Sequence, residues 1–367
     1  MREQLDKIAS IKASHPGNIA MACFDMAYFQ SLSPKLQERL LACVNSGIDN
    51  PDSDVGCYAC LPEDYDDLHP FFSKVISRHH GIAPDARHIS DWRIEDGSKL
   101  DIGQLGLGAH SLRIRVGRNF DDLPLTSAMS RADRLVLEER MCNVFQKVAT
   151  DGQIAGQYVS LTPGHINEID TATYRHLVDQ HIMFKNMSLD GYLTAAGIAA
   201  DWPYGRGCYY SADESFIVWV GEEDHLRIMV MQKTTCLADV LGRLQEALSA
   251  LENTAGYAFA RSNHYGAITT CPTNLGTGMR ASIHLKLPNL TGSDGTTDKV
   301  REIAGPLGLA VRGLGGEHTP VGADGTVDIS PRARLCVTEG EIVSRLYQGI
   351  ARLIEAERQT TTPDTAA

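Results

Sequence analysis

The stretch FIVWVGEEDHLRIMVM, residues 216–231, decides the fold of this chain. Its two apolar runs, 216–220 and 226–231, are rich in β-branched and aromatic residues, which favour strands. The intervening GEED at 221–224 has the composition of a tight turn. The stretch therefore predicts two neighbouring antiparallel strands with several carboxylates in the turn between them.

Further strand patterns lie on both sides of this hairpin. Ser111 to Arg115 and Ser282 to Leu287 alternate polar and apolar residues, and Val327 to Ser330 is a short strand-like run. Apolar residues at helical spacing predict helices between them, over 131–149, 171–184, 237–251, 298–307 and 338–357. Strands joined by tight turns, with helices at irregular intervals, predict an α+β fold with a mostly antiparallel sheet flanked by helices.

The first 80 residues carry helical periodicity instead, and predict a small all-α domain. Within them, residues 45–67 are rich in Gly, Asp, Pro and Ser and predict a loop, and 71–79 predicts another helix. The expected organisation is a helical domain at 1–82, a linker at 83–108, the larger domain at 109–358 and a flexible tail at 359–367.

The composition of the chain excludes several classes of protein. The chain has 367 residues, 43% of them hydrophobic, and a formal net charge of −12. These values exclude a disordered chain and argue against nucleic acid as a partner. No run of eighteen apolar residues and no secretory leader is present in the sequence, so we expect no membrane partner and a cytoplasmic location.

Nine scattered cysteines fit free thiols in a reducing compartment better than a disulfide framework. The pair Cys57-x-x-Cys60 is interpreted as two free thiols in a loop. A redox-active pair and half of a zinc site are the alternatives, because a single such pair carries little information.

Several arginines stand beside glycines or strand ends although the chain is acidic. Arg113 and Arg115 are two residues apart, so on a strand they share a face. Guanidinium groups bind phosphate oxygens bidentately, and converging arginines could hold a triphosphate. The alternative for each arginine is an ordinary exposed side chain.

Carboxylates form a second candidate group, in the 221–224 turn and at Glu317 after a glycine-rich run. Such groups could orient a guanidinium or accept a proton from a nitrogen nucleophile. The alternative is that they are solvated turn residues.

The stretch CPTNLGTGMRASIH, residues 271–284, is the third candidate. Its glycines allow backbone N–H groups to approach a ligand, which predicts an anion-binding loop. It contains neither a Walker phosphate loop nor a dinucleotide fingerprint.

Extended to CPTNLGTGMRASIHLKLP, this stretch closely resembles the signature of the phosphagen (guanidino) kinases, the family of arginine kinase and creatine kinase. SLRIRVGR at 111–118, the hairpin at 216–232, VRGLGGEHT at 311–319 and VDIS at 327–330 match further segments in the same order. The resemblance runs from about residue 51 to 357. It implies the two-domain fold expected above and reversible transfer of the γ-phosphoryl group of MgATP to a guanidino nitrogen.

The resemblance also implies roles for individual residues. Glu223 and Glu317 would clamp the guanidinium, and Cys271 would lie beside the substrate nitrogen. We expect neighbouring cations to depress the pKa of Cys271 and favour the thiolate. Mg²⁺ would be held mainly by nucleotide and water, with Glu222 as the candidate protein ligand. The implied ATP/ADP-binding residues are Ser111, Arg113, Arg115, His181, Arg227, Arg280, Ser282, His284, Arg312 and Asp328.

Residues 53–58 resemble the loop with which arginine kinases hold the substrate carboxylate through backbone N–H groups and a tyrosine. The implied substrate-binding residues are Ser53, Asp54, Val55, Gly56 and Tyr58. Asp54 departs from the usual glycine and would repel a substrate carboxylate unless it points away. Glu317 favours arginine as the substrate, and we predict arginine.

Alternatives to an arginine kinase stay open at this point. Taurocyamine or another guanidino acid is the alternative substrate. A protein-arginine kinase and a nucleotide-binding protein without catalysis are more distant alternatives. The family contains monomers and homodimers, so the resemblance predicts neither state over the other.

Overall fold

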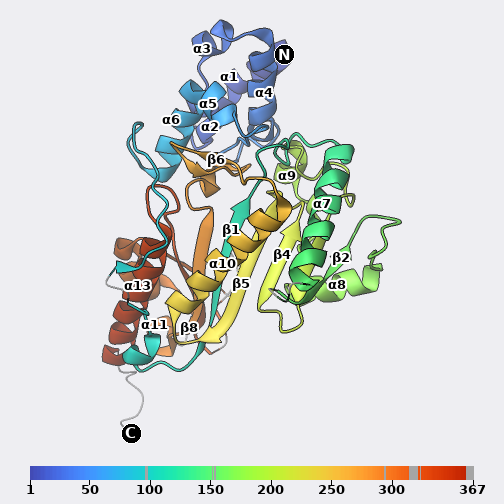
Figure 1. Cartoon of the computed structure of the whole chain (residues 1–367). Coiled ribbons are helices and arrows are strands. Elements are labelled where there is room, and N and C mark those ends of the chain that lie inside the picture. Colours follow the sequence, from blue (N-terminus) through green and yellow to red (C-terminus); the bar gives the residue numbers. More distant parts are fainter. Residues whose placement is uncertain are drawn as a thin grey trace. The chain divides into compact units, whose positions relative to one another are not determined.

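A computed structural model describes residues 1–95, 98–150, 152, 154–292, 295–313, 321–322 and 324–360 (Figure 1). Contacts within the chain divide it into two compact units. Unit 1 comprises Met1–His88, Gly117–Ile228 and Ser249–Gly278, and unit 2 comprises Ile89–Val116, Met229–Leu248 and Met279–Ala367. The domain boundaries expected from the sequence divide the chain differently and stay a prediction.

The N-terminal part of unit 1 is helical, as predicted. Its helices are α1 (Arg2–Ser14), α2 (Ile19–Cys23), α3 (Met26–Ser31), α4 (Pro34–Asp49), α5 (Asp64–Asp67) and α6 (His69–His80). Their apolar faces form a core that includes Ile8, Leu40 and Phe72, each at most 2% exposed. Burial of these faces stabilises helices that are too short to be stable alone.

The predicted loop over 45–67 is wrong at both of its ends, because α4 continues to Asp49 and α5 begins at Asp64. Gly47, which suggested a turn, lies inside α4. A Cβ atom there would stand 2.5 Å from the carbonyl oxygen of Gly56. The glycine therefore permits a close approach between the helix and the following loop.

The rest of unit 1 combines helices and strands. Its elements are α7 (Arg131–Thr150), β2 (Gly156–Ser160), α8 (Thr171–Asp179), η3 (Met187–Leu189), α9 (Gly191–Ala195), β3 (Gly207–Ser211), β4 (Phe216–Val220), β6 (Arg261–Ser262), β7 (Gly266–Ala267) and η4 (Pro272–Asn274). Helix α8 is shorter than the predicted 171–184. His181 adopts a left-handed φ of 61°, and the next two N–H groups turn back to the carbonyl of Leu177.

Unit 2 contains η2 (Ile102–Leu105), β8 (Met279–Lys286), α11 (Pro288–Thr291), α12 (Asp298–Ala304), η5 (Gly305–Leu307), β9 (Leu309–Arg312), β10 (Thr326–Pro331) and α13 (Glu339–Gln359). Three elements cross the division between the units: β1 (His110–Arg118), β5 (Leu226–Thr234) and α10 (Leu237–Ala255). Thr338 and Glu341 form a reciprocal capping box at the start of α13.

Eight strands form one sheet in the order β2-β3-β4-β5-β1-β8-β10-β9. The pairs β2–β3, β3–β4, β1–β8, β8–β10 and β10–β9 are antiparallel. Helix α13 packs on β8 and β10 within unit 2. The predicted α+β class, with N-terminal helices and a larger antiparallel sheet flanked by helices, is confirmed. In the described part of the chain, every helix is too short or too polar to cross a bilayer.

Candidate active site

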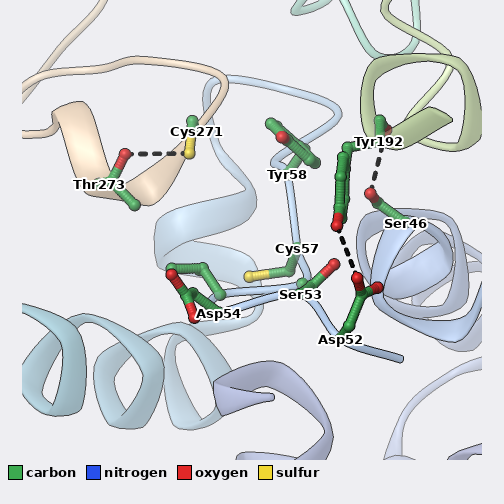
Figure 2. Close-up of a pocket in the computed structure, with 11 residues that line it drawn as sticks. Ser46, Asp52, Ser53, Asp54, Cys57, Tyr58, Tyr192, Cys271 and Thr273 are labelled. Atoms are coloured by element: carbon green, nitrogen blue, oxygen red, sulfur yellow. Dashed lines mark hydrogen bonds between the residues drawn. The ribbon is translucent and has the colours of Figure 1, made fainter. Parts of the chain in front are cut away.

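A pocket of about 310 Å³ opens in unit 1 between the 52–58 segment, α4, α9 and η4 (Figure 2). All five predicted substrate-binding residues line it, and so does the predicted catalytic Cys271. Tyr192 closes one side: its carbonyl accepts a hydrogen bond from Ser46 at 3.0 Å, and its hydroxyl donates to Asp52 at 2.9 Å. The structure thus brings together residues that lie more than 200 positions apart in the sequence.

The backbone of the 53–58 loop is held from outside the pocket. The carbonyls of Asp54 and Val55 accept hydrogen bonds from the N-terminus of α2, at 3.0 and 2.9 Å. Within the described residues, the N–H groups of 54–57 have no hydrogen-bond acceptor, and the hydroxyl of Ser53, only 7% exposed, has no partner. Buried polar groups without a partner are costly, so this loop is suited to an acceptor such as a carboxylate.

The expectation that the pKa of Cys271 is depressed is wrong. Burial, reinforced by the negative charge of Glu223, raises the pKa of the Cys271 thiol to about 12. Its Sγ lies 3.1 Å from the hydroxyl of Thr273, which opposes the rise but does not overcome it. The sequence suggested cations near this sulphur, whereas the groups that act on it are carboxylates and an apolar environment.

The turn after β4 holds a compact ion-pair cluster. Nη2 of Arg227 lies 2.9 Å from Glu222 and 3.2 Å from Glu223. Burial alone would lower the pKa of Arg227, but the two carboxylates overcome this effect and raise it. The guanidinium also lies 5.5 Å from the centre of the Trp219 ring. Two residues with different predicted roles, Glu223 and Arg227, therefore neutralise each other here.

A buried network that the sequence analysis missed fixes this turn. Asn119 Nδ2 donates to Asp224 at 2.8 Å and to the carbonyl of Ile268 at 3.1 Å, and its Oδ1 accepts from the N–H of His225 at 2.8 Å. Asp224 also accepts from the N–H of Thr270 at 2.7 Å. Burial raises the pKa of Asp224 against these donors.

His225 completes the network. Its Nδ1 accepts from the N–H of Phe120 at 3.0 Å, so its Nε2 donates to the carbonyl of Pro124 at 2.8 Å. Burial lowers the pKa of His225 to about 4, which keeps the ring neutral. Asn119 and His225 are positioning residues for the carboxylates of the turn.

In unit 2 the predicted nucleotide-binding residues lie on one face of adjacent strands. In the β1–β8 ladder, Arg113 stands opposite Ser282 and Arg115 opposite Arg280. In the neighbouring ladders, Asp328 stands opposite both His284 and Arg312. The apolar residues between them in β1 and β8 are buried on the other face. The expectation that Arg113 and Arg115 share a face is therefore confirmed.

Arg280 is the centre of this face. It forms an ion pair with Asp328, and its Nε donates to the hydroxyl of Ser330 at 3.2 Å. Burial lowers the pKa of Arg280 to about 10, and the positive charges of Arg312, Arg334 and Arg113 add to the effect. Arg334 was not among the predicted residues, because it lies in an irregular segment after β10. A cluster of partly buried guanidinium groups is the electrostatic environment that a polyphosphate needs.

Four predicted site residues lie apart from Arg280 and its neighbours or outside the described residues. Ser111 is exposed at the start of β1, and His181 and Arg227 belong to unit 1. Glu317 lies outside the described residues.

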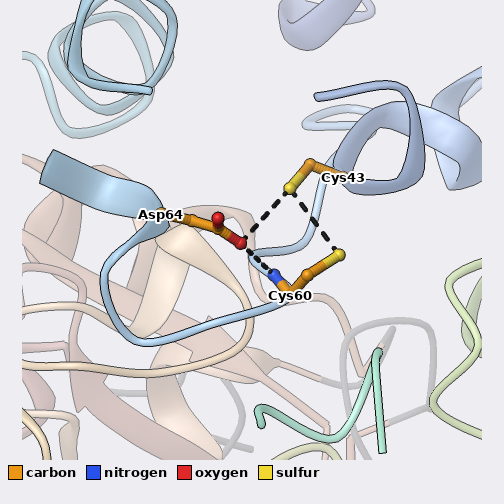
Figure 3. A group of neighbouring side chains, drawn as sticks. All are labelled: Cys43, Cys60 and Asp64. Atoms are coloured by element: carbon orange, nitrogen blue, oxygen red, sulfur yellow. Dashed lines mark hydrogen bonds between the residues drawn. The ribbon is translucent and has the colours of Figure 1, made fainter. Parts of the chain in front are cut away.

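The two cysteines of the Cys57-x-x-Cys60 pair have different neighbours. Cys57 lines the pocket, whereas Cys60 packs against Cys43 and Asp64 (Figure 3). All nine cysteines are free, as the sequence predicted.

Two family models match this chain. The family model described as "ATP:guanido phosphotransferase, C-terminal catalytic domain" matches residues 136–360, and the model of the N-terminal domain matches 28–77. An arginine kinase of Anthopleura japonica is 37% identical over 90% of this chain and 45% of its own. A probable arginine kinase of Caenorhabditis elegans is 37% identical over 88% of this chain and 79% of its own.

Solved structures of related enzymes have the same fold. A duplicated taurocyamine kinase from Schistosoma mansoni superimposes with a TM-score of 0.82 at 29% identity, covering 96% of this chain and 48% of that one. A lombricine kinase gives 0.78 at 25% identity and covers 93% and 92%. This chain thus spans about half the length of the Anthopleura japonica and Schistosoma mansoni chains, and most of the length of the other two. The chain belongs to the ATP:guanido phosphotransferase family.

Proposed function

We propose that this protein reversibly transfers the γ-phosphoryl group of ATP to the guanidino nitrogen of arginine, as an energy buffer in the cytoplasm. The observation that carries the proposal is the pocket in which the 53–58 loop and Cys271 meet. Relatives named as arginine kinases, at 35–37% identity over most of this chain, support the choice of substrate.

The pocket suits the two ends of arginine. The N–H groups of 54–57 would donate hydrogen bonds to the α-carboxylate of arginine. Tyr58 would cover the aliphatic part of the substrate between its carboxylate and its guanidinium. The guanidinium would lie toward Cys271 and Glu223, which are close enough to interact electrostatically. Asp54 is an exposed residue, so solvent screens its repulsion of the substrate carboxylate.

The arginine-rich face of β1, β8 and β9 would bind the nucleotide phosphates. Mg²⁺ bound to the phosphates would supply further neutralisation of negative charge, and Glu222 is the carboxylate of this chain assigned to it. The positive charges of Arg312 and Arg334 already act against the charged form of Arg280, which is partly buried. Anion binding would relieve that repulsion, which is why the residues present fit a nucleotide.

Phosphoryl transfer needs alignment and charge stabilisation rather than covalent participation by the protein. Glu223 would fix the planar guanidinium so that one nitrogen faces the phosphorus in line with the leaving oxygen. Alignment of this kind can supply about 7–11 kcal/mol of the barrier. The Cys271 thiol, protonated in the free protein, would respond to the arriving guanidinium by losing its proton, since a nearby cation favours the thiolate.

A coupled assay with arginine, taurocyamine, glycocyamine and creatine tests the proposal. We expect the highest kcat/KM with arginine. The schistosome neighbour acts on taurocyamine, which makes this the second candidate substrate. If ATP binds and none of the four compounds is phosphorylated, the proposed function is wrong.

A further inference from the structure

Two buried thiols meet in unit 1 (Figure 3). Cys43 lies on α4, and Cys60 follows the pocket-lining segment by two residues. Their sulphur atoms are 3.7 Å apart. Cys43 is 1% exposed and Cys60 is 7% exposed, and both are free thiols.

The backbone holds the two cysteines in this position. The N–H of Tyr58 donates to the carbonyl of Cys43 at 2.9 Å, which joins the two segments near the thiols. The N–H of Cys60 donates to Asp64 at 2.7 Å, and the N–H of Ala59 donates to the carbonyl of Thr270 at 2.8 Å. The contact between the sulphurs is therefore a fixed feature of the fold.

We propose that Cys43 and Cys60 form a site of reversible oxidative modification, at which hydrogen peroxide converts the thiol pair into a disulfide. A disulfide has a sulphur–sulphur distance of about 2.05 Å, so the sulphurs must approach by only about 1.7 Å. Rotation of the two side chains can supply part of such a movement. This site is separate from the proposed phosphoryl-transfer chemistry and does not depend on it.

A metal site is the competing interpretation, because Asp64 adds a third potential ligand atom to the two sulphurs. The Asp64 oxygens are already occupied, however. One accepts from the guanidinium of Arg39. The other accepts from the N–H groups of Cys60 and Leu61, both at 2.7 Å, and from the Cys43 thiol at 3.6 Å. A cation at this position would compete with Arg39 for the same carboxylate, so the geometry favours the thiol pair alone.

The order of events follows from the environments of the two sulphurs. Cys60 is the more exposed, and the hydrogen bond from Cys43 lowers its pKa, whereas that of Cys43 is raised. After losing its proton to solvent, Cys60 attacks one peroxide oxygen. The O–O bond breaks, a sulfenic acid forms, and the hydroxide released takes the proton of Cys43.

The Cys43 thiolate then attacks the Cys60 sulphur and breaks its S–O bond. The hydroxide that leaves regains a proton from solvent. Two thiols and one hydrogen peroxide thus give one disulfide and two waters. The new bond would tie α4, which presents Ser46 to the pocket, to the chain that presents Tyr58. Oxidation is therefore expected to change the pocket as well as to protect the two sulphurs from further oxidation.

Mass spectrometry of the full-length protein tests the proposal directly. Trypsin leaves all three cysteines of this region on one peptide, 40–74. Cleavage before aspartate separates Cys43 from Cys57, and chymotryptic cleavage after Tyr58 separates Cys57 from Cys60. After one equivalent of peroxide and alkylation of the remaining thiols, we expect a Cys43–Cys60 crosslinked peptide that dithiothreitol removes.

The variants Cys43→Ser and Cys60→Ser should each abolish this crosslink, and the matched control Cys23→Ser on α2 should retain it. If a variant fails to fold, the crosslinked peptide from the wild-type protein still identifies the two cysteines by its mass. A crosslink to Cys57 or Cys271 instead, or oxidation of Cys60 without any crosslink, would overturn the proposal. So would stoichiometric zinc in the purified protein that blocks both thiols until a chelator removes it.

Discussion

Asn119→Ala should destabilise unit 1 and impair catalysis together. The side chain is fully buried and makes three hydrogen bonds, two with backbone groups and one with the Asp224 carboxylate. A neutral hydrogen bond contributes about 0.5–1.5 kcal/mol and one to a charged group about 1.5–3 kcal/mol. Loss of all three therefore predicts a decrease in the free energy of unfolding of about 2.5–6 kcal/mol.

The catalytic effect follows from the position of the network. Asp224 and His225 directly follow Glu222 and Glu223, so loosening them displaces the carboxylate assigned to the substrate. A misplacement of 1 Å can cost on the order of 10²-fold in rate, and we expect kcat to fall on this scale.

Urea unfolding followed by circular dichroism, with the arginine kinase assay on the same preparations, measures both effects. Asn143→Ala on the exposed side of α7 is the matched control and should change stability by no more than about 0.5 kcal/mol. If Asn119→Ala shifts the unfolding midpoint no further than this control does, the role assigned to the network is refuted.

Three other predictions concern single residues. Alkylation of Cys271 in the absence of substrates should accelerate about tenfold per pH unit up to its pKa of about 12, and a plateau near neutral pH would contradict the burial of this thiol. His225 binds its proton in the unfolded chain near pH 6.5 and in the folded chain near pH 4, so stability should decrease as the pH falls between these values, by about 3 kcal/mol in total. His225→Gln should remove this contribution in urea unfolding at a series of pH values, and the similar contribution of His88, whose pKa is also lowered to about 4 by burial, should remain. Arg280→Lys should raise KM for ATP without changing KM for arginine, and an equal effect from Arg345→Lys on the exposed side of α13 would argue against a nucleotide site at Arg280.

Much of the fold could be predicted from local patterns. The hairpin at 216–231 and the alternating strand at 282–287 were recognisable because strand periodicity and turn composition lie within a few residues. The end of α8 was not predictable, because it depends on the backbone angle of His181. The loop predicted over 45–67 was wrong at Gly47 for a related reason. Glycine composition does not distinguish a turn from a helix that approaches another backbone closely.

Some residues of the candidate site could also be predicted from local patterns, and others could not. Residues 53–58 and Cys271 could be named from motifs, and the structure places them around one pocket. The Asn119 network could not be found, because its members are about 105 residues apart in sequence and are ordinary residue types. The protonation of Cys271 depends on burial and on Glu223, and neither follows from the motif that contains the cysteine.

The ion pairs of Arg227 have a thermodynamic consequence for a two-substrate reaction. This guanidinium pairs with Glu222 and Glu223, and Glu223 is the carboxylate assigned to the guanidinium of the proposed substrate. An arriving arginine would displace it from Glu223 and release it for a phosphate, and an arriving nucleotide would release Glu223 for arginine. Each ligand would thereby lower the cost of binding the other. Because such coupling is reciprocal, saturating ATP should tighten arginine binding by the same factor as saturating arginine tightens ATP binding.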